Sequence, residues 1–292
     1  MSFARHQTFH LRAGWLAKAV DALAQDSRIF SSKTASSQLG IGRNMVQSLR
    51  FWVGAAGLVK RGPRGRGLLL SDFAELVEMY DPYFELEFTW WLIHYHIASD
   101  ENEATSWYYL FNLLPVMEFD RVFFVDELDK YCAKVIKKSI ARRSLNRDYD
   151  CILATYLPSN GQGTPEDNII CPLSELHLLE EVGNDKVRKT PPPLELPPEV
   201  LFLALRNAPH GLRVNALDVL DTPCSIGKLF NLSIDAIYRY LDNMQEKGWV
   251  SVSRTADLNS ITISDIDPWA LIKQRYEKEA HKVAGGKASE AK

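Results

Sequence analysis

Four polar side chains between residues 43 and 50 have the types and the spacing that recognise nucleic-acid bases. They are Arg43, Asn44, Gln47 and Arg50. Arginine can form two hydrogen bonds with guanine, and asparagine or glutamine can form two with adenine. The apolar residues around them recur at helical spacing and are Leu39, Ile41, Val46, Leu49, Trp52 and Val53. Because these apolar residues form an inward stripe, the four polar side chains are expected to point outward.

The segments on either side have the order of a winged helix-turn-helix unit. From Thr34 onward a short helix precedes a glycine-bearing turn, and the polar helix follows. A basic hairpin comes next, and its candidate phosphate contacts are Lys60, Arg61, Arg64 and Arg66. In such a unit the second helix enters the major groove of DNA. The pattern therefore predicts a unit that binds double-stranded DNA.

Charge is segregated along the chain, although the formal net charge is only −3. Residues 1–70 carry eleven Lys or Arg and two acids, whereas residues 71–130 carry fourteen acids and two bases. Residues 131–147 carry six bases and no acid, and one helix there is expected to align Lys134, Lys138 and Arg142 for DNA. A local positive field attracts a phosphate backbone. The alternative is that the basic and acidic segments pack against each other.

A second unit of the same kind begins near residue 223. A shift of 191 residues superimposes the first unit on it without a gap, so that Gly57 falls on Gly248. Ser233 is expected to cap its second helix and Gly248 to end that helix. Two short strands should follow, at residues 250–253 and 260–264, as a wing.

The function of this second unit stays open between two alternatives. Residues 201–292 carry twelve bases against eleven acids, so this copy is much less basic than the first. Tyr238 and Arg239 are its candidate DNA contacts. An assembly surface is the other interpretation, because a fold alone does not make a DNA reader.

The predicted fold is mainly α with small β wings (α+β), with two winged helix-turn-helix units flanking a helical, aromatic-rich central region. The predicted boundaries are residues 1–80 for the N-terminal winged unit and 81–190 for the helix-rich central domain, with strands and turns over 148–190. Residues 191–281 hold the C-terminal winged unit after a Pro-rich linker, and residues 282–292 form a disordered tail.

Composition is typical of a cytoplasmic protein. No run of 18 apolar residues exists, so no membrane partner is expected. The four cysteines have no CxxC spacing and are read as free thiols, not as a disulfide or zinc framework. No nucleotide-binding loop is found, so the chain is not expected to hydrolyse ATP.

No short motif supplies a catalytic centre. Asp148 with Asp150, and Glu166 with Asp167, are weak candidates for holding a metal, and the acidic run at residues 120–129 is typical of a solvated face. The catalytic residues therefore stay unknown, and no metal ligand is assigned.

Two pairs of side chains, at residues 5–6 and 94–96, could have either a functional or a structural role. His94 and His96 lack the i,i+4 spacing of a ligand pair and are interpreted as structural. Arg5 and His6 could touch phosphate. They could equally belong to an extended N-terminal segment that Phe3 and Phe9 tie to the core.

The chain resembles a bacterial family long described as a domain of unknown function. The resemblance rests on Phe3, Arg5, His6, Thr8, Phe9, Arg12, Gly14, Trp15 and Leu16, then on Leu39, Gly40, Ile41, Gly42, Asn44, Met45, Val46, Ser48, Leu49, Arg50 and Trp52. Genes of that family lie beside cysteine desulfurases and phosphoadenosine phosphosulfate (PAPS) reductase-like proteins, in DNA phosphorothioation clusters that act in antiviral defence.

The resemblance implies a DNA-binding component of a phosphorothioate modification complex, with the other proteins of that complex as partners. It further implies nicking of one DNA strand so that sulfur can be incorporated, and a divalent metal such as Mg²⁺ would then be the cofactor. The alternatives are a winged-helix transcriptional regulator and a non-enzymatic scaffold of a DNA-modification complex. Whether the chain forms a homo-oligomer is left open.

Overall fold

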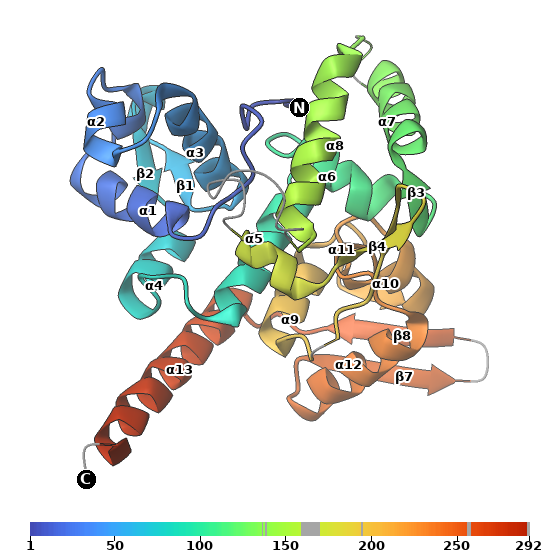
Figure 1. The fold of residues 1–292 in the computed structure, drawn as a ribbon. Coiled ribbons are helices and arrows are strands. Elements are labelled where there is room, and N and C mark those ends of the chain that lie inside the picture. The colour runs from blue at the N-terminus through green and yellow to red at the C-terminus, as the bar shows by residue number, and fades with distance from the viewer. Residues whose placement is uncertain (136, 138, 159–169, 194, 256–257, 291–292) are drawn as a thin grey trace.

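The structure is a computed structural model that describes residues 1–135, 137, 139–158, 170–193, 195–255 and 258–290, with no account of the side chains of 64, 254–259 and 282–290. Most of the described chain is helical, and three small antiparallel sheets complete the fold (Figure 1). The expectation of a mainly helical protein with small sheets is therefore confirmed.

The first unit consists of three helices, a two-stranded hairpin and a fourth helix. In chain order these are α1 (Trp15–Gln25), α2 (Ala35–Leu39), α3 (Arg43–Ala55), β1 (Val59–Arg61), β2 (Leu68–Leu70) and α4 (Asp72–Tyr80). Helix α3 is amphipathic: its inward side buries Val46, Leu49 and Trp52, and the Trp52 indole N–H donates to the carbonyl of Phe9 at 3.1 Å. In the hairpin, Val59 lies opposite Leu70.

The central region is a helical core with one small sheet of the order β3-β5-β4. Its elements are α5 (Glu87–Ser99), α6 (Thr105–Tyr108), a π-helical turn (Tyr109–Leu113), β3 (Glu118–Asp120), α7 (Arg121–Val135), α8 (Arg142–Tyr156), β4 (Leu179–Gly183) and β5 (Lys186–Lys189). Helix α5 is buried on nearly every side, as a helix without a polar face must be. The expected strand-and-turn region at 148–190 is wrong over its first nine residues, which belong to α8.

The last unit begins at Pro198, directly after the proline-rich segment. It contains α9 (Pro198–Asn207), β6 (Arg213–Asn215), α10 (Ala216–Asp221), α11 (Ile226–Leu229), α12 (Ile234–Glu246), β7 (Val250–Thr255), β8 (Leu258–Ile263) and α13 (Pro268–Glu290). The expected strand pair is observed as β7 and β8, and β6 joins β8. The expected disordered tail overlaps the end of α13, and that boundary stays a prediction.

The two units repeat each other in register. Helix α3 shifted by 191 residues coincides with α12, residue for residue. Backbone hydrogen bonds recur at the same shift: Ile41 to Ser36 and Leu58 to Val53 in the first unit, Leu232 to Gly227 and Trp249 to Met244 in the second. Ser233 caps α12 through the N–H of Ala236, and Gly248 ends it at φ 74°, both as predicted.

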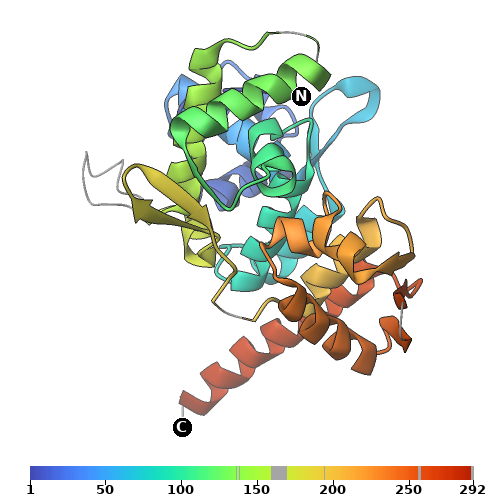
Figure 2. The same cartoon turned by 90° about the vertical axis from the view of Figure 1, so that its right-hand side faces the viewer.

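Helix α5 lies between the two units, and α13 packs against α4 of the first unit and α9 of the last (Figure 1). Figure 2 shows the β1–β2 hairpin reaching to the edge of the molecule on the side of the first unit. The first unit thus packs against α13 through α4, while its hairpin lies at the surface.

Candidate nucleic-acid interface

The four candidate base contacts share the exposed side of α3. Arg43, Asn44, Gln47 and Arg50 are all exposed, whereas Val46 and Leu49 between them are buried. Neither arginine forms an ion pair within the described part of the chain, and α3 contains no acidic residue. The helix therefore presents an uncompensated positive, hydrogen-bonding surface to solvent.

The turn before α3 sets the direction of this surface. Gly40 ends α2 in the left-handed region at φ 64°, where a residue with a side chain would be strained. The N–H of Ile41 then bonds to the carbonyl of Ser36 at 3.1 Å, and the N–H of Val46 to the carbonyl of Gly42 at 2.9 Å. These bonds close α2 and start α3 within three residues.

The four basic residues predicted to bind phosphate in the hairpin beside α3 differ in their surroundings. Arg61 and Arg66 are exposed and form no ion pair with any described residue. Lys60 instead bonds Asp72 of α4, Nζ to Oδ1, at 2.7 Å. This bond raises the pKa of Lys60 and lowers the pKa of Asp72. Arg64 lies in the loop, and its side chain is outside the described part.

A further cation beside the hairpin is not predicted by the sequence pattern. The N–H of Leu68 donates to the carbonyl of Ser27 at 2.8 Å, so the segment before the 3-10 turn at Ile29–Ser31 lies along β2. The exposed Arg28 follows immediately. Gly67, at φ 71°, makes this approach possible, because a Cβ there would lie 2.9 Å from the carbonyl oxygen of Ser27. Arg28 is one of the eleven basic residues counted over residues 1–70, but no sequence pattern predicts that it lies beside residue 68.

The expected row of Lys134, Lys138 and Arg142 does not exist. Helix α7 ends at Val135 and α8 begins at Arg142, so one helix does not carry all three residues. Lys134 is exposed at the end of α7, Arg142 bonds Asp126 at 2.7 Å, and Lys138 lies outside the described residues. The physical reason is that α7 and α8 both bury apolar stripes against the same core, which requires the chain to reverse between them.

In the second unit, α12 presents a different surface. Tyr238 is half-buried and already has a partner, while Arg239 is exposed. The positions equivalent to Asn44 and Arg50 hold Asp235, which is exposed, and Leu241, which is buried. The second DNA contact therefore stays a prediction with less support than the first.

Asp148 is a structural residue in the described chain, not an open metal ligand. Its carboxylate accepts from the N–H of Ala4 at 2.7 Å, from Ser106 Oγ at 2.6 Å and from His6 Nε2 at 2.9 Å. The side chains of His6, Ser106 and Asp148 are buried, and His6 Nδ1 accepts from the N–H of Thr8. His6 therefore anchors a turn-rich N-terminal segment, not an extended one.

The other candidate ligands also have structural partners. Asp150 bonds Arg121 at 2.6 Å, and Glu166 and Asp167 lie outside the described residues. The two ring nitrogens of His94 bond Tyr156 Oη and the carbonyl of Leu229, and burial lowers the pKa of His94 to about 4. No group of three His, Cys, Asp or Glu side chains suited to a metal occurs in the described ranges.

Burial raises the pKa of the four cysteine thiols. Cys132, Cys151 and Cys171 are buried, Cys224 is half-buried, and all four are free. Burial raises the pKa of Cys132 to about 11 and that of Cys171 to about 12. A sulfur carrier needs an accessible thiolate, so the burial of these thiols does not favour such a role here.

No helix in the described part is both long and apolar enough to cross a membrane.

Comparison with known proteins gives one family and one group of structures. Two solved structures match over 94% of this chain and 88% of theirs. They are "Magnesium ion-bound SspB crystal structure", with 26% identity and a TM-score of 0.83, and "SspB crystal structure", with 25% identity and a TM-score of 0.81. A search of curated proteins finds no match. Residues 3–276 match the family described as "Protein of unknown function (DUF4007)", and the chain therefore belongs to this family.

Proposed function

We propose that this chain is a DNA-binding component of a DNA phosphorothioation system. Two observations support the assignment to that system: SspB is a protein of such a system, and its fold matches over nearly the whole chain. The resemblance to a family encoded in phosphorothioation clusters agrees with both. Other proteins of the modification complex are then the partners.

The exposed α3 surface is the single observation that carries DNA binding. We infer that residues 1–80 and 191–281 are winged helix-turn-helix units, in which α3 and α12 are the second helices and β1–β2 and β7–β8 the wings. In this arrangement Arg43, Asn44, Gln47 and Arg50 face the major groove. Arg28, Arg61 and Arg66 lie beside them and bind phosphate.

Binding is tested with a labelled duplex and the variant in which Arg43, Asn44, Gln47 and Arg50 are all alanine. The four side chains are exposed, so the variant is expected to fold. Wild type should bind in fluorescence anisotropy, and the variant should bind at least about tenfold more weakly, because each bidentate contact contributes roughly 1–3 kcal/mol. Equal affinity would refute the assignment of α3 as the reader.

Strand nicking is a second proposal, and one SspB structure holding a magnesium ion is the observation that favours it. The described residues do not present a ready three-ligand site for such an ion, so we assign no ligand to it. The test incubates the protein alone with supercoiled plasmid, with and without Mg²⁺. Open circles that require Mg²⁺ would establish a nicking enzyme, and a retarded but intact plasmid would assign the chemistry to partners.

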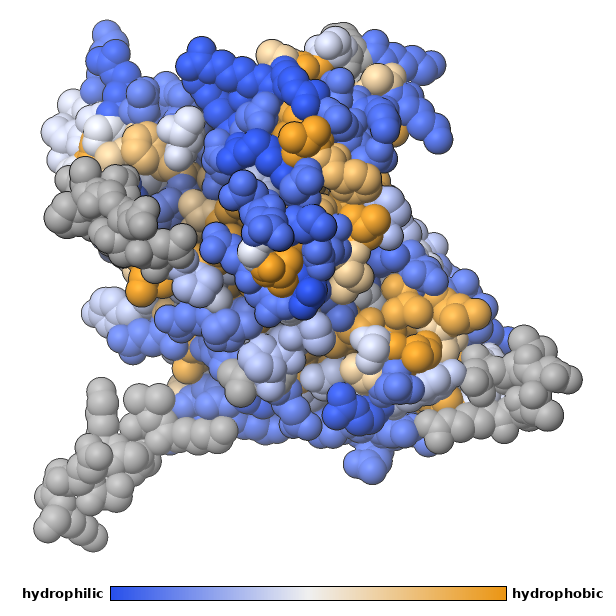
Figure 3. Space-filling model, turned by 45° about the vertical axis from the view of Figure 1, so that its right-hand side comes forward, coloured by the Kyte–Doolittle hydropathy of each residue, from blue (hydrophilic) through white to orange (hydrophobic). Residues whose placement is uncertain are grey.

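A non-enzymatic scaffold is the other candidate that a specific observation favours. Val122 and Leu217 are large apolar side chains with 61% and 65% of their surface exposed. Figure 3 shows hydrophobic areas among the hydrophilic side chains on one face of the molecule. Exposed apolar side chains of this size are compatible with contacts to proteins of a complex, and a pull-down with the purified partner proteins would test that role.

A further inference from the structure

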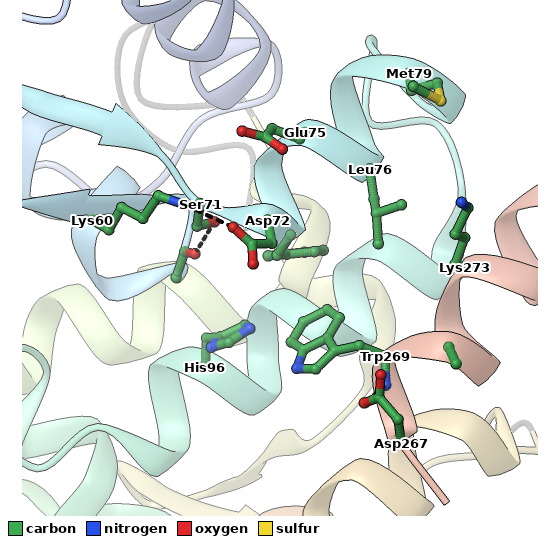
Figure 4. Close-up of a pocket in the computed structure, with 13 residues that line it drawn as sticks. Lys60, Ser71, Asp72, Glu75, Leu76, Met79, His96, Asp267, Trp269 and Lys273 are labelled. Carbon is green, nitrogen blue, oxygen red and sulfur yellow. Dashed lines mark hydrogen bonds and ion pairs between the residues drawn. The ribbon is translucent and has the colours of Figure 1, made fainter.

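A cavity of about 860 Å³ lies behind the basic hairpin, between α4, the C-terminal half of α5 and the first turns of α13 (Figure 4). Its volume is within the range of roughly 300–1,000 Å³ that is usual for small-molecule sites. Three segments far apart in the sequence therefore meet around one ligand-sized space.

Aromatic rings form the floor of this cavity. The rings of Phe73 and His96 are stacked, with centroids 5.2 Å apart and 25° between their planes, and those of His96 and Trp269 are 6.1 Å apart at 20°. A Cβ at Gly57 would lie 2.5 Å from the His96 ring, so the backbone of Gly57 supports the ring from one side. Figure 4 shows the indole of Trp269 below Leu76, with open space between them. A flat ring system fits that space.

Polar groups at the rim restrict what this ligand can be. Asp72, Glu75 and Asp267 place carboxylates around the opening, with Lys60 and Lys273 on two of its sides. In the floor below them, His96 Nε2 is buried and has no hydrogen-bond partner in the described chain. Burial lowers the pKa of His96 to about 4, so the ring is neutral near pH 7. A planar ligand with N–H donors and ring acceptors fits these groups, whereas a free phosphate would meet three carboxylates.

We propose that this cavity accepts an unstacked nucleobase of the bound DNA, one with an exocyclic amino group. The proposal rests on the DNA binding proposed above. Lys60 links the basic hairpin to the cavity, because it belongs to the hairpin strand β1 and also lines the cavity. The base stacks on Trp269, as bases do on aromatic platforms, and its amino group donates to a rim carboxylate, as cytosine N4 does to Asp or Glu. Its phosphate stays outside, toward the hairpin.

The first experiment measures saturation-transfer NMR on the full chain with deoxycytidine and thymidine as probes. Deoxycytidine has the amino group and thymidine lacks it, so the deoxycytidine signal should be several-fold stronger. Ala270→Trp places an indole in the cavity from an exposed position of α13, and Trp269→Leu removes the stacking surface. Each should reduce the signal at least about fivefold, the factor that corresponds to the weaker end of base–aromatic stacking. Tyr83→Ala, which removes an exposed aromatic ring outside the lining, is the matched control.

The second experiment uses a duplex in which every adenine of one strand is 2-aminopurine. Anisotropy of an end label reports binding, and near-ultraviolet circular dichroism of the stacked 2-aminopurines reports unstacking. Wild type should bind and lower the dichroism, and Ala270→Trp should bind without lowering it. Wild type that binds with unchanged dichroism, or a nucleoside signal that Ala270→Trp does not reduce, would overturn the base site alone. No binding to any duplex would refute the proposed function.

Discussion

Replacing both Arg61 and Arg66 with alanine should weaken binding to every duplex and flatten its dependence on salt. Both side chains are exposed and free of ion pairs in the described structure, so each can neutralise one phosphate. Each phosphate contact contributes about 0.9 to the slope of log affinity against log salt, so the slope should fall by about 1.8. Between 50 and 200 mM salt, wild type should then lose roughly tenfold more affinity than the variant does.

The assay is a series of anisotropy titrations at several salt concentrations on two unrelated duplexes. The control variant combines Lys130→Ala and Lys278→Ala, which removes the same charge from exposed positions of α7 and α13. A slope that falls equally in both variants would assign the effect to net charge. An unchanged slope for Arg61→Ala/Arg66→Ala would remove the hairpin from the interface.

Asn44→Ala or Gln47→Ala should reduce sequence preference by about 1–3 kcal/mol at one base pair, and competition binding with single-substituted duplexes would show no change if α3 were not the reader. Asp148→Ala leaves two buried donors, on His6 and Ser106, and the part-buried N–H of Ala4 without an acceptor, so urea denaturation should show a loss of about 3 kcal/mol. Asp150→Ala breaks only an exposed pair and should lose less than about 1 kcal/mol; equal losses would contradict the anchoring role. Gly57→Ala should lower the melting temperature more than Gly65→Ala, since both glycines have φ 71° but only Gly57 contacts a ring; equal melting temperatures would contradict that contact. The pKa of buried His94 falls from 6.5 to about 4, so the unfolded chain binds the proton first and stability should fall as pH drops from 6.5 to 4, by up to about 3 kcal/mol; His94→Gln should flatten this fall, and an unaltered pH profile would argue against a neutral His94.

The repeat could be predicted from the sequence because its signals are local. Helix-turn-helix geometry depends on a few adjacent positions: an apolar stripe, a residue that starts the second helix and a glycine that ends it. Gly57 and Gly248 occupy the same position 191 residues apart, both at positive φ. The shifted alignment therefore predicts α12 and its flanking bonds without reference to any tertiary contact.

The helical hairpin of α7 and α8 could not be predicted in this way. Residues 131–147 have helix-forming composition throughout, and nothing local ends the helix at Val135. The break becomes necessary only when both apolar stripes face one core. The bond between His6 and Asp148 is similar, because it joins residues 142 positions apart. Such partners depend on packing, so the sequence could show Asp148 only as an isolated carboxylate.

Charge segregation serves two purposes in the folded chain. Arg5–Glu103 and Lys60–Asp72 join the basic first segment to the acidic second one, so internal pairing is real at these points. The four exposed polar side chains of α3 form no ion pair with any described residue. Helix α4 exposes Asp72, Glu75 and Glu78 behind the hairpin, and these carboxylates repel a phosphate backbone from that side. If the proposed function holds, DNA is therefore expected on the face of α3 and the hairpin, and only a neutral base is expected to pass the acidic rim into the cavity.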